Sequence, residues 1–174
     1  MACGTAYHAT LCGSQVLERT TKLPVIVMVA SEFRYNDPLI DEHTLAIFVS
    51  QSGETADTLA ALRLAKEKGA TTIAIANVLG STISRDADYV LYTCAGPEIA
   101  VASTKAYTTQ LVLLMLLAYY IAQVLGKDID HELIDQLNTI PQYVENILND
   151  HAIFENYAKM LENLHDAYFI GRSL

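Results

Sequence analysis

The chain has 174 residues, of which 52% are hydrophobic and 18% are charged. This composition argues against disorder and predicts one folded domain with a helical appendage. The formal net charge of −9 would repel the phosphate backbone of DNA or RNA, so no nucleic-acid partner is expected. A small anionic ligand is still compatible with this charge, because a local site can attract what the whole molecule repels.

The three cysteines, Cys3, Cys12 and Cys94, form no C-x-x-C pair and show no metal-binding spacing. Their odd number favours a reducing, cytoplasmic location, no metal is expected, and burial is favoured over a nucleophilic role for Cys3. No basic segment precedes an apolar one at the N-terminus, so no signal peptide is expected. The most apolar stretch, residues 111–122, is shorter than the roughly 18–20 residues that span a bilayer, which favours a buried helix and no membrane partner.

Apolar runs alternate with helical patterns over the first half of the chain. The helical patterns predict helices at residues 7–18, 55–68 and 81–86, with Gly69 closing the second of them. Four apolar runs without polar alternation predict strands that are covered on both faces, at residues 25–30, 45–49, 72–76 and 89–93. This alternation is typical of a doubly wound parallel sheet with right-handed crossovers.

After Gly96 and Pro97 the pattern becomes helical. Ser103 or Thr104 can cap a long helix that reaches Leu125 and closes at Gly126. Further helices are predicted at residues 130–137 and 141–164, and a last strand at 167–171. We therefore divide the chain into a domain at 1–127 and a helical extension at 128–174. Residues 1–5 resemble the end of a strand and the loop after it, so we expect the chain to be a segment of a longer protein.

One loop carries the strongest chemical signal, because hydroxyl and amide side chains cluster between a predicted strand and a predicted helix. Open α/β sheets bind ligands beyond the carboxyl ends of their strands, and a helix N-terminus offers unpaired N–H groups and partial positive charge to an anion. Glycine lets the backbone approach closely. The loop consists of Ser50, Gln51, Ser52, Gly53, Glu54 and Thr55.

The loop contains no lysine or arginine, which suits one phosphomonoester better than a triphosphate. The phosphate-loop pattern G-x-x-x-x-G-K-[ST] and the dinucleotide pattern G-x-G-x-x-G are both absent. The same residues are also common in ordinary turns and helix caps. Spacing alone leaves both interpretations open.

Two other loops could border the same ligand. Residues 3–6 would face the Ser50 loop in a sheet of order 2-1-3-4-5, since strands 1 and 3 are neighbours there. Residues 96–105 precede the long helix and could add donors, although a capped helix with a solvated Lys105 explains them as well. Glu54 and Glu98 are the only acids in these loops, and acids at helix starts more often serve the helix dipole than act as bases.

Four segments together resemble a known family. They are residues 3–8 (CGTAYH), 30–35 (ASEFRY), 50–58 (SQSGETADT) and 96–106 (GPEIAVASTKA). In this order they are similar to the first sugar isomerase (SIS) half of the isomerase region in the glutamine–fructose-6-phosphate aminotransferase family, the glucosamine-6-phosphate synthases. The resemblance covers essentially the whole chain.

The resemblance implies an α/β fold, a three-layer α-β-α sandwich around a five-stranded parallel sheet with flavodoxin-like strand order. It also implies an enzyme that uses no metal or organic cofactor, and a hexose 6-phosphate ligand. By position in the family motifs, the phosphate would be held by Ser50, Gln51, Ser52 and Thr55, and the rest of the sugar would contact Thr5, Val101 and Ser103. Ala6 replaces the serine of many relatives, which removes one hydroxyl.

The family's glutaminase domain has no counterpart in these residues, and of its second SIS half only the first strand is expected, at the end of the helical extension, so no catalytic residue is assigned. We expect a sugar-phosphate-binding half with little catalysis of its own. A stand-alone sugar-phosphate-sensing module is the alternative, and a fragment without ligand binding is a third. The long apolar helix is expected to mediate a homodimer, and residues 167–171 are expected to fill the slot of the first strand within their own chain or in a neighbour.

Overall fold

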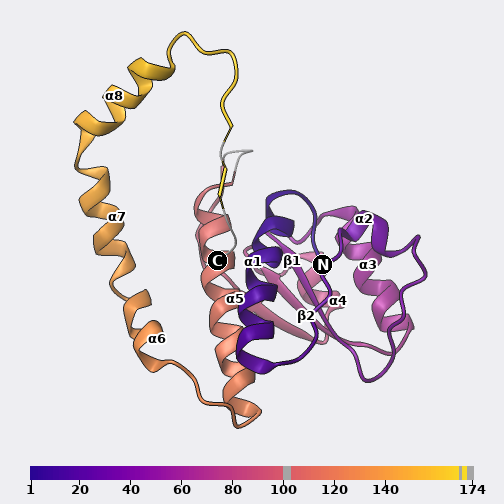
Figure 1. Cartoon of the computed structure of the whole chain (residues 1–174). Helices are drawn as coiled ribbons and strands as arrows, with labels where there is room; N and C mark the ends of the chain where they lie inside the picture. The colour runs from indigo at the N-terminus through magenta and orange to yellow at the C-terminus, as the bar shows by residue number, and fades with distance from the viewer. Residues whose placement is uncertain (100–102, 169, 172–174) are drawn as a thin grey trace. The chain divides into compact units, whose positions relative to one another are not determined.

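The computed structural model describes residues 1–99, 103–168 and 170–171. The chain divides into two compact units, Met1–Ile129 and Asp130–Leu174. The first unit is built on a parallel sheet with helices, and the second consists of helices (Figure 1).

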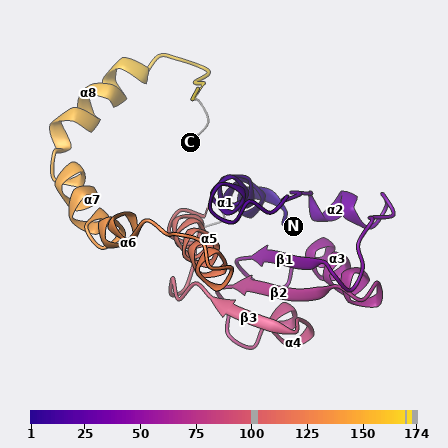
Figure 2. The same cartoon turned by 60° about the horizontal axis from the view of Figure 1, so that its bottom comes forward.

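Among the described residues, three strands form the sheet. They are β1 (Leu45–Ser50), β2 (Thr71–Ala76) and β3 (Tyr89–Tyr92), in the order β1-β2-β3 and all parallel. Figure 2 shows the three arrows side by side. Three of the four apolar runs are therefore confirmed as strands, and the doubly wound pattern of strand and helix holds in this part of the chain.

Helices pack on both faces of this sheet, so alternate residues of each strand enter different cores. On one face, Phe48 of β1 packs with α2 (Ala30–Phe33), α3 (Ala56–Glu67) and α4 (Thr82–Asp86). On the other face, Val49 packs with α1 (Gly4–Thr21) and α5 (Lys105–Val124). In Figure 1, α1 and α5 lie to the left of the strands and α3 to the right. Burial on both faces explains why the strands are continuously apolar.

The prediction of a strand at residues 25–30 is wrong. The segment forms one parallel bridge, between Val29 and Ala2, and α2 already begins at Ala30. Met1 and Ala2 lie between this segment and β1, because the Ala30 N–H donates to the Ala2 carbonyl (2.9 Å) and the Val49 N–H donates to the Met1 carbonyl (3.0 Å). A ladder needs a partner at every step. Among the described residues this ladder consists of a single bridge, so the sheet there has three strands and not the five that were expected.

Helix α5 is longer than the apolar stretch that predicted it. It has 20 residues and is, by length and composition, long and apolar enough to cross a membrane. The argument that this stretch is too short to span a bilayer was therefore wrong. Its Leu114 and Leu117 are buried in the same core as α1, and Gly13 of α1 approaches Leu114 so closely that a Cβ there would lie 2.9 Å from the Leu114 Cβ. These contacts are those of a core helix. The closing residue Gly126 has a φ of 68°, as its predicted role requires.

The second unit contains α6 (His131–Leu137), α7 (Ile140–Leu148) and α8 (His151–Leu161). The single helix predicted at residues 141–164 is thus interrupted, after Leu148. Residues 167, 168, 170 and 171 are outside any strand, and residue 169 lies outside the described part of the chain. The prediction that the end of this extension belongs to the start of a second SIS half is not tested by these residues.

The Asp88 side chain connects the starts of β2 and β3, and its contacts lead to a prediction for the stability of the fold. Its carboxylate accepts bonds from the Thr72 N–H (2.9 Å) and hydroxyl (2.7 Å) and pairs with Lys66 (2.9 Å). The Lys66 contact, followed by the Thr72 bonds, lowers the pKa of Asp88 to about 2. A carboxyl with a lowered folded-state pKa stabilises the fold above its unfolded pKa near 3.8, and this contribution is lost as pH falls towards 2.

We therefore expect Asp88→Asn to lower the free energy of unfolding by about 1 kcal/mol at pH 7. The full linkage value would be about 2.5 kcal/mol, and solvent screening reduces it, because the side chain is 36% exposed. The difference from the natural chain should shrink between pH 4 and pH 2, because a carboxyl whose folded-state pKa is lowered to about 2 loses its stabilising effect as it becomes protonated. Urea denaturation at several pH values measures this, with Asp128→Asn at an exposed position as the control. A difference that is independent of pH would contradict the assignment.

Candidate functional site

A cavity of about 340 Å³ lies at the carboxyl end of β1. Five of the seven predicted site residues line it together, from the start of α1 and from the loop after β1: Thr5, Ser50, Gln51, Ser52 and Thr55. Ser103 is not among the lining residues, and Val101 lies outside the described part of the chain. The remaining lining residues are Cys3, Gly4, Ala6, Val49 and Gln110.

The Ser50 loop folds into a turn that its own hydroxyls hold. The Gly53 N–H donates to Ser50 Oγ (3.0 Å), and the Glu54 N–H donates to Ser52 Oγ (3.2 Å). Ser50 Oγ also lies 3.2 Å from Thr55 Oγ1. Because the serine oxygens accept bonds inside the loop, the Ser52 hydroxyl hydrogen and one hydrogen of the Ser50–Thr55 pair are available to donate elsewhere. The loop is thus held as a turn by its serine oxygens, and its hydroxyl hydrogens can still donate to a ligand.

Gly53 is required at its position for two reasons. Its φ is 69°, in the left-handed region, and a Cβ there would clash with Ser81, whose own Cβ would be 2.6 Å away. The Gly53 carbonyl accepts a bond from the Ile83 N–H (3.0 Å), which fastens the turn to α4. The close approach of the loop to α4 therefore fixes the shape of the cavity wall.

Two helices begin at the cavity. Thr55 is the N-cap residue of α3 and Cys3 that of α1, and neither side chain caps its helix. The first N–H groups of a helix have no partner within it and carry partial positive charge. Among the described residues, none that lines the cavity has a charged side chain. The site therefore offers hydroxyls, amides and helix ends, a donor set that suits one small anion with further hydroxyls.

The two acids near the site serve as helix caps, which agrees with the favoured interpretation of each. The Glu54 carboxylate accepts a bond from the Thr82 N–H (2.7 Å) at the start of α4, and this bond lowers the pKa of Glu54. The Glu98 carboxylate accepts a bond from the Ala106 N–H (3.2 Å) in the first turn of α5. Thr104 takes the N-cap position of α5 but makes no side-chain cap. Glu98 thus supplies the cap that was predicted for Ser103 or Thr104.

Asn77 connects the Ser50 loop to the segment before α5. Its N–H donates to the Gln51 carbonyl (3.1 Å), and its side-chain oxygen accepts bonds from the Thr93 hydroxyl (3.0 Å) and the Ala95 N–H (2.9 Å). Its side-chain nitrogen donates to the Gly96 carbonyl (2.7 Å). The segment that begins at Gly96 is thereby held beside the loop that lines the cavity.

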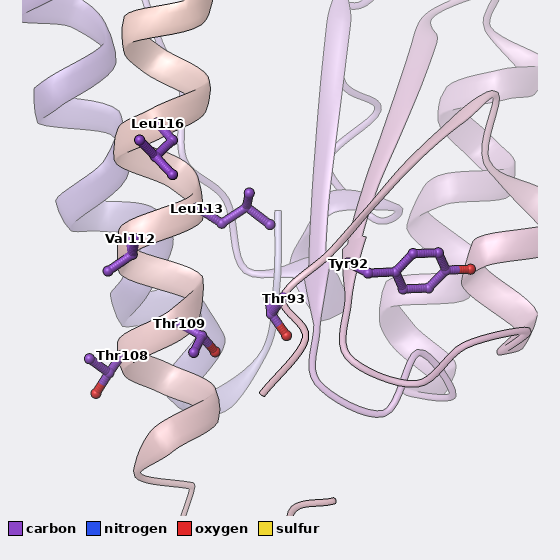
Figure 3. A pocket seen from close by; sticks show the side chains of 7 residues that line it. All are labelled: Tyr92, Thr93, Thr108, Thr109, Val112, Leu113 and Leu116. Carbon is purple, nitrogen blue, oxygen red and sulfur yellow. The ribbon is translucent and has the colours of Figure 1, made fainter. Parts of the chain in front are cut away.

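A second cavity, of about 220 Å³, lies between β3 and α5 (Figure 3). In that view Leu113 and Thr93 point toward the space between the strand and the helix, and the Tyr92 ring points away from α5. Its lining is largely apolar, from residues Tyr92, Thr93, Thr108, Thr109, Val112, Leu113 and Leu116. It has neither the hydroxyl loop nor the helix starts of the first cavity, so it does not suit a polar anion.

Sequence patterns missed Gln110, which lines the first cavity and is only 3% exposed. It lies inside α5, where an amide among apolar residues looks like an ordinary interruption of the pattern. The only available signal was that interruption itself, a single polar residue at a position that faces the core.

A family model described as "SIS domain" matches residues 1–120. The chain belongs to the SIS domain family. The match contains both loops that line the first cavity and the beginning of α5. The fold is therefore the α/β fold of SIS domains, with a parallel sheet and helices.

The relatives agree with the family resemblance. The chain is 54% identical over its whole length to a glutamine–fructose-6-phosphate aminotransferase (isomerizing) of Clostridium tetani and 51% identical to one of Caldanaerobacter subterraneus. It spans 29% of the length of each. Among solved structures, the C-terminal domain of the Francisella tularensis glucosamine-fructose-6-phosphate aminotransferase superposes with a TM-score of 0.92 at 36% identity, over 99% of this SIS domain and 49% of that chain.

Proposed function

We propose that this SIS domain binds a hexose 6-phosphate, fructose 6-phosphate or glucosamine 6-phosphate, as one half of the isomerase region of a glutamine–fructose-6-phosphate aminotransferase. The observation that carries the proposal is the uncharged cavity in which Thr5, Ser50, Ser52 and Thr55 meet two helix starts. Hydroxyls and helix ends are donors for a phosphomonoester, and no base is needed for binding alone. The names of the curated relatives support the choice of ligand.

In this proposal the Ser50 loop holds the phosphate through Ser50, Gln51, Ser52 and Thr55. Thr5 contacts the sugar from the start of α1, and Val101 and Ser103 complete that side. Glu54 and Glu98 bind helix starts, so neither is assigned as the base of an isomerisation. The chain is thus a binding half, and the enzyme activity belongs to the longer protein.

Calorimetric titration of the full chain with fructose 6-phosphate tests the proposal. We expect saturable binding of one ligand, competition by inorganic phosphate, and no binding of unphosphorylated fructose at the same concentration. Equal binding of fructose would mean that the loop does not hold a phosphate. Measurable conversion of fructose 6-phosphate to glucose 6-phosphate by the chain alone would contradict the absence of a catalytic base. No observation favours the alternative of a stand-alone sensing module.

For the complete isomerase region we expect a sheet of order 2-1-3-4-5 with two further strands, one that includes Met1 and Ala2 and one that ends at Val29, although in this chain the latter segment forms a single bridge. The Met1 amine donates to the Ile47 carbonyl, the Val49 N–H donates to the Met1 carbonyl and the Ala30 N–H donates to the Ala2 carbonyl, and these contacts are compatible with this order. The result would be a five-stranded, three-layer sandwich.

A homodimer in the cytoplasm is also part of the proposal. Helix α5 exposes Leu116, Tyr120 and Val124, which lie at i, i+4 and i+8 and so share one face. Sedimentation of the chain should give a dimer, and Tyr120→Glu should shift it towards the monomer. A monomer in the unchanged chain would contradict the role of this face.

A further inference from the structure

Gln110 has the features of a ligand contact that neither the loop motif nor the family motifs assign. Its residue is 3% exposed, yet its side chain lines the cavity of the Ser50 loop. Within the described part of the chain its amide has no hydrogen bond, and because Ser81 Oγ is the one fully enclosed side-chain polar atom there without a partner, the Gln110 amide is open to the cavity. An amide that faces a cavity and has no partner in its own chain can bind a polar ligand group that enters the cavity.

The position of Gln110 tells which part of a ligand it would meet. Ser50 and Gln110 are both 3% exposed and form the buried polar end of the cavity, whereas Thr5 is exposed. Helical side chains lean towards the N-terminus of their helix, so the Gln110 amide leans towards the start of α5. A ligand group that reaches Ser50 therefore reaches the wall that Gln110 forms.

We propose that Gln110 is a phosphate-binding residue of this site, and that its amide nitrogen donates to a phosphate oxygen from the α5 side, opposite the Ser50 loop. This inference rests on the proposed function. The amide adds a donor without a charge, in keeping with a lining that has no charged side chain. It also explains why a polar side chain is buried in an otherwise apolar part of α5.

The test uses Gln110→Met in the full chain, because methionine has nearly the same shape and no amide. We expect binding of fructose 6-phosphate and of inorganic phosphate to weaken together by about tenfold, the value of one strong hydrogen bond. We expect the ligand-free chain to melt at the same or a higher temperature, since the substitution removes no hydrogen bond within the described part of the chain and adds an apolar side chain to the helix. A purely structural glutamine would move the melting temperature down. The matched control is Gln123→Met, on the same helix but exposed, which should change neither quantity.

The second variant, Gln110→Glu, keeps the size and polarity and places a negative charge in the site, so it should weaken both ligands by about 100-fold. Binding within twofold of the natural chain in either variant would overturn the proposal. So would a loss for fructose 6-phosphate without a loss for inorganic phosphate, or a loss that is matched by a lower melting temperature. If the natural chain binds neither ligand, the proposed function fails, which is a separate result from failure of the variants alone.

Discussion

Ser52→Asp is expected to weaken the binding of fructose 6-phosphate about 100-fold. Ser52 lines a cavity without charged side chains, so a carboxylate there has no counter-ion and faces the phosphate directly. At a separation of about 5 Å and an effective dielectric constant of about 20, two unit charges of the same sign repel by about 3 kcal/mol. This energy corresponds to about two powers of ten in Kd, which calorimetric titration at fixed ionic strength measures.

The matched control for the charge is Ser52→Asn. Asparagine has the shape of aspartate and, like Ser52 Oγ, can accept the bond from the Glu54 N–H that holds the turn. It lacks the charge of aspartate and the hydroxyl of serine, so we expect the affinity for fructose 6-phosphate to fall by about tenfold or less, as for the loss of one neutral hydrogen bond. Equal losses in the two variants would mean that the bound group is not an anion at this loop.

The parts of the site that depend on local sequence could be predicted. The Ser50 loop lies between an apolar run and a helical pattern, and its hydroxyls and glycine are properties of six adjacent residues. The strands β1, β2 and β3 follow from continuous apolar runs, because burial on both faces removes polar alternation. The glycines that end α3 and α5 could also be predicted, because each directly follows a helical pattern. Their φ values are 92° and 68°.

The parts that depend on distant partners could not be predicted. Residues 25–29 have the composition of a strand, but only Ala2 pairs with them, at Val29. The break between α7 and α8 follows Leu148, where no glycine or proline marks it. Gln110 becomes a site residue only because α5 packs against α1 beside the Ser50 loop. The bridge at Val29 and the position of Gln110 depend on contacts between segments far apart in the chain. The break after Leu148 is not marked by a glycine or proline in the local sequence.

Gly53→Ala is expected to lower the free energy of unfolding by about 3 kcal/mol and to disrupt the turn that we propose binds the phosphate. About 1 kcal/mol comes from the left-handed backbone conformation, which alanine adopts poorly. The rest comes from overpacking, because the new Cβ would lie 2.6 Å from the Ser81 Cβ and 2.9 Å from Ile83 Cγ2. Relief of this clash must move the loop away from α4, and the donors of Ser50 and Ser52 move with it. Urea denaturation and titration with fructose 6-phosphate measure the two effects.

Gly80→Ala separates backbone strain from the clash. Gly80 has a φ of 68°, close to that of Gly53, but a Cβ there would meet nothing within 4 Å. Its cost should be the strain alone, about 1 kcal/mol, with ligand binding unchanged. Adding Ser81→Gly to Gly53→Ala should recover most of the remaining loss, since it removes the two atoms nearest to the new Cβ and leaves only the contact with Ile83 Cγ2. The Ser81→Gly single variant completes the double-mutant cycle. Equal costs for the two alanine variants would show that the loop can move away from α4 freely, and the shape of the cavity would then not depend on that contact.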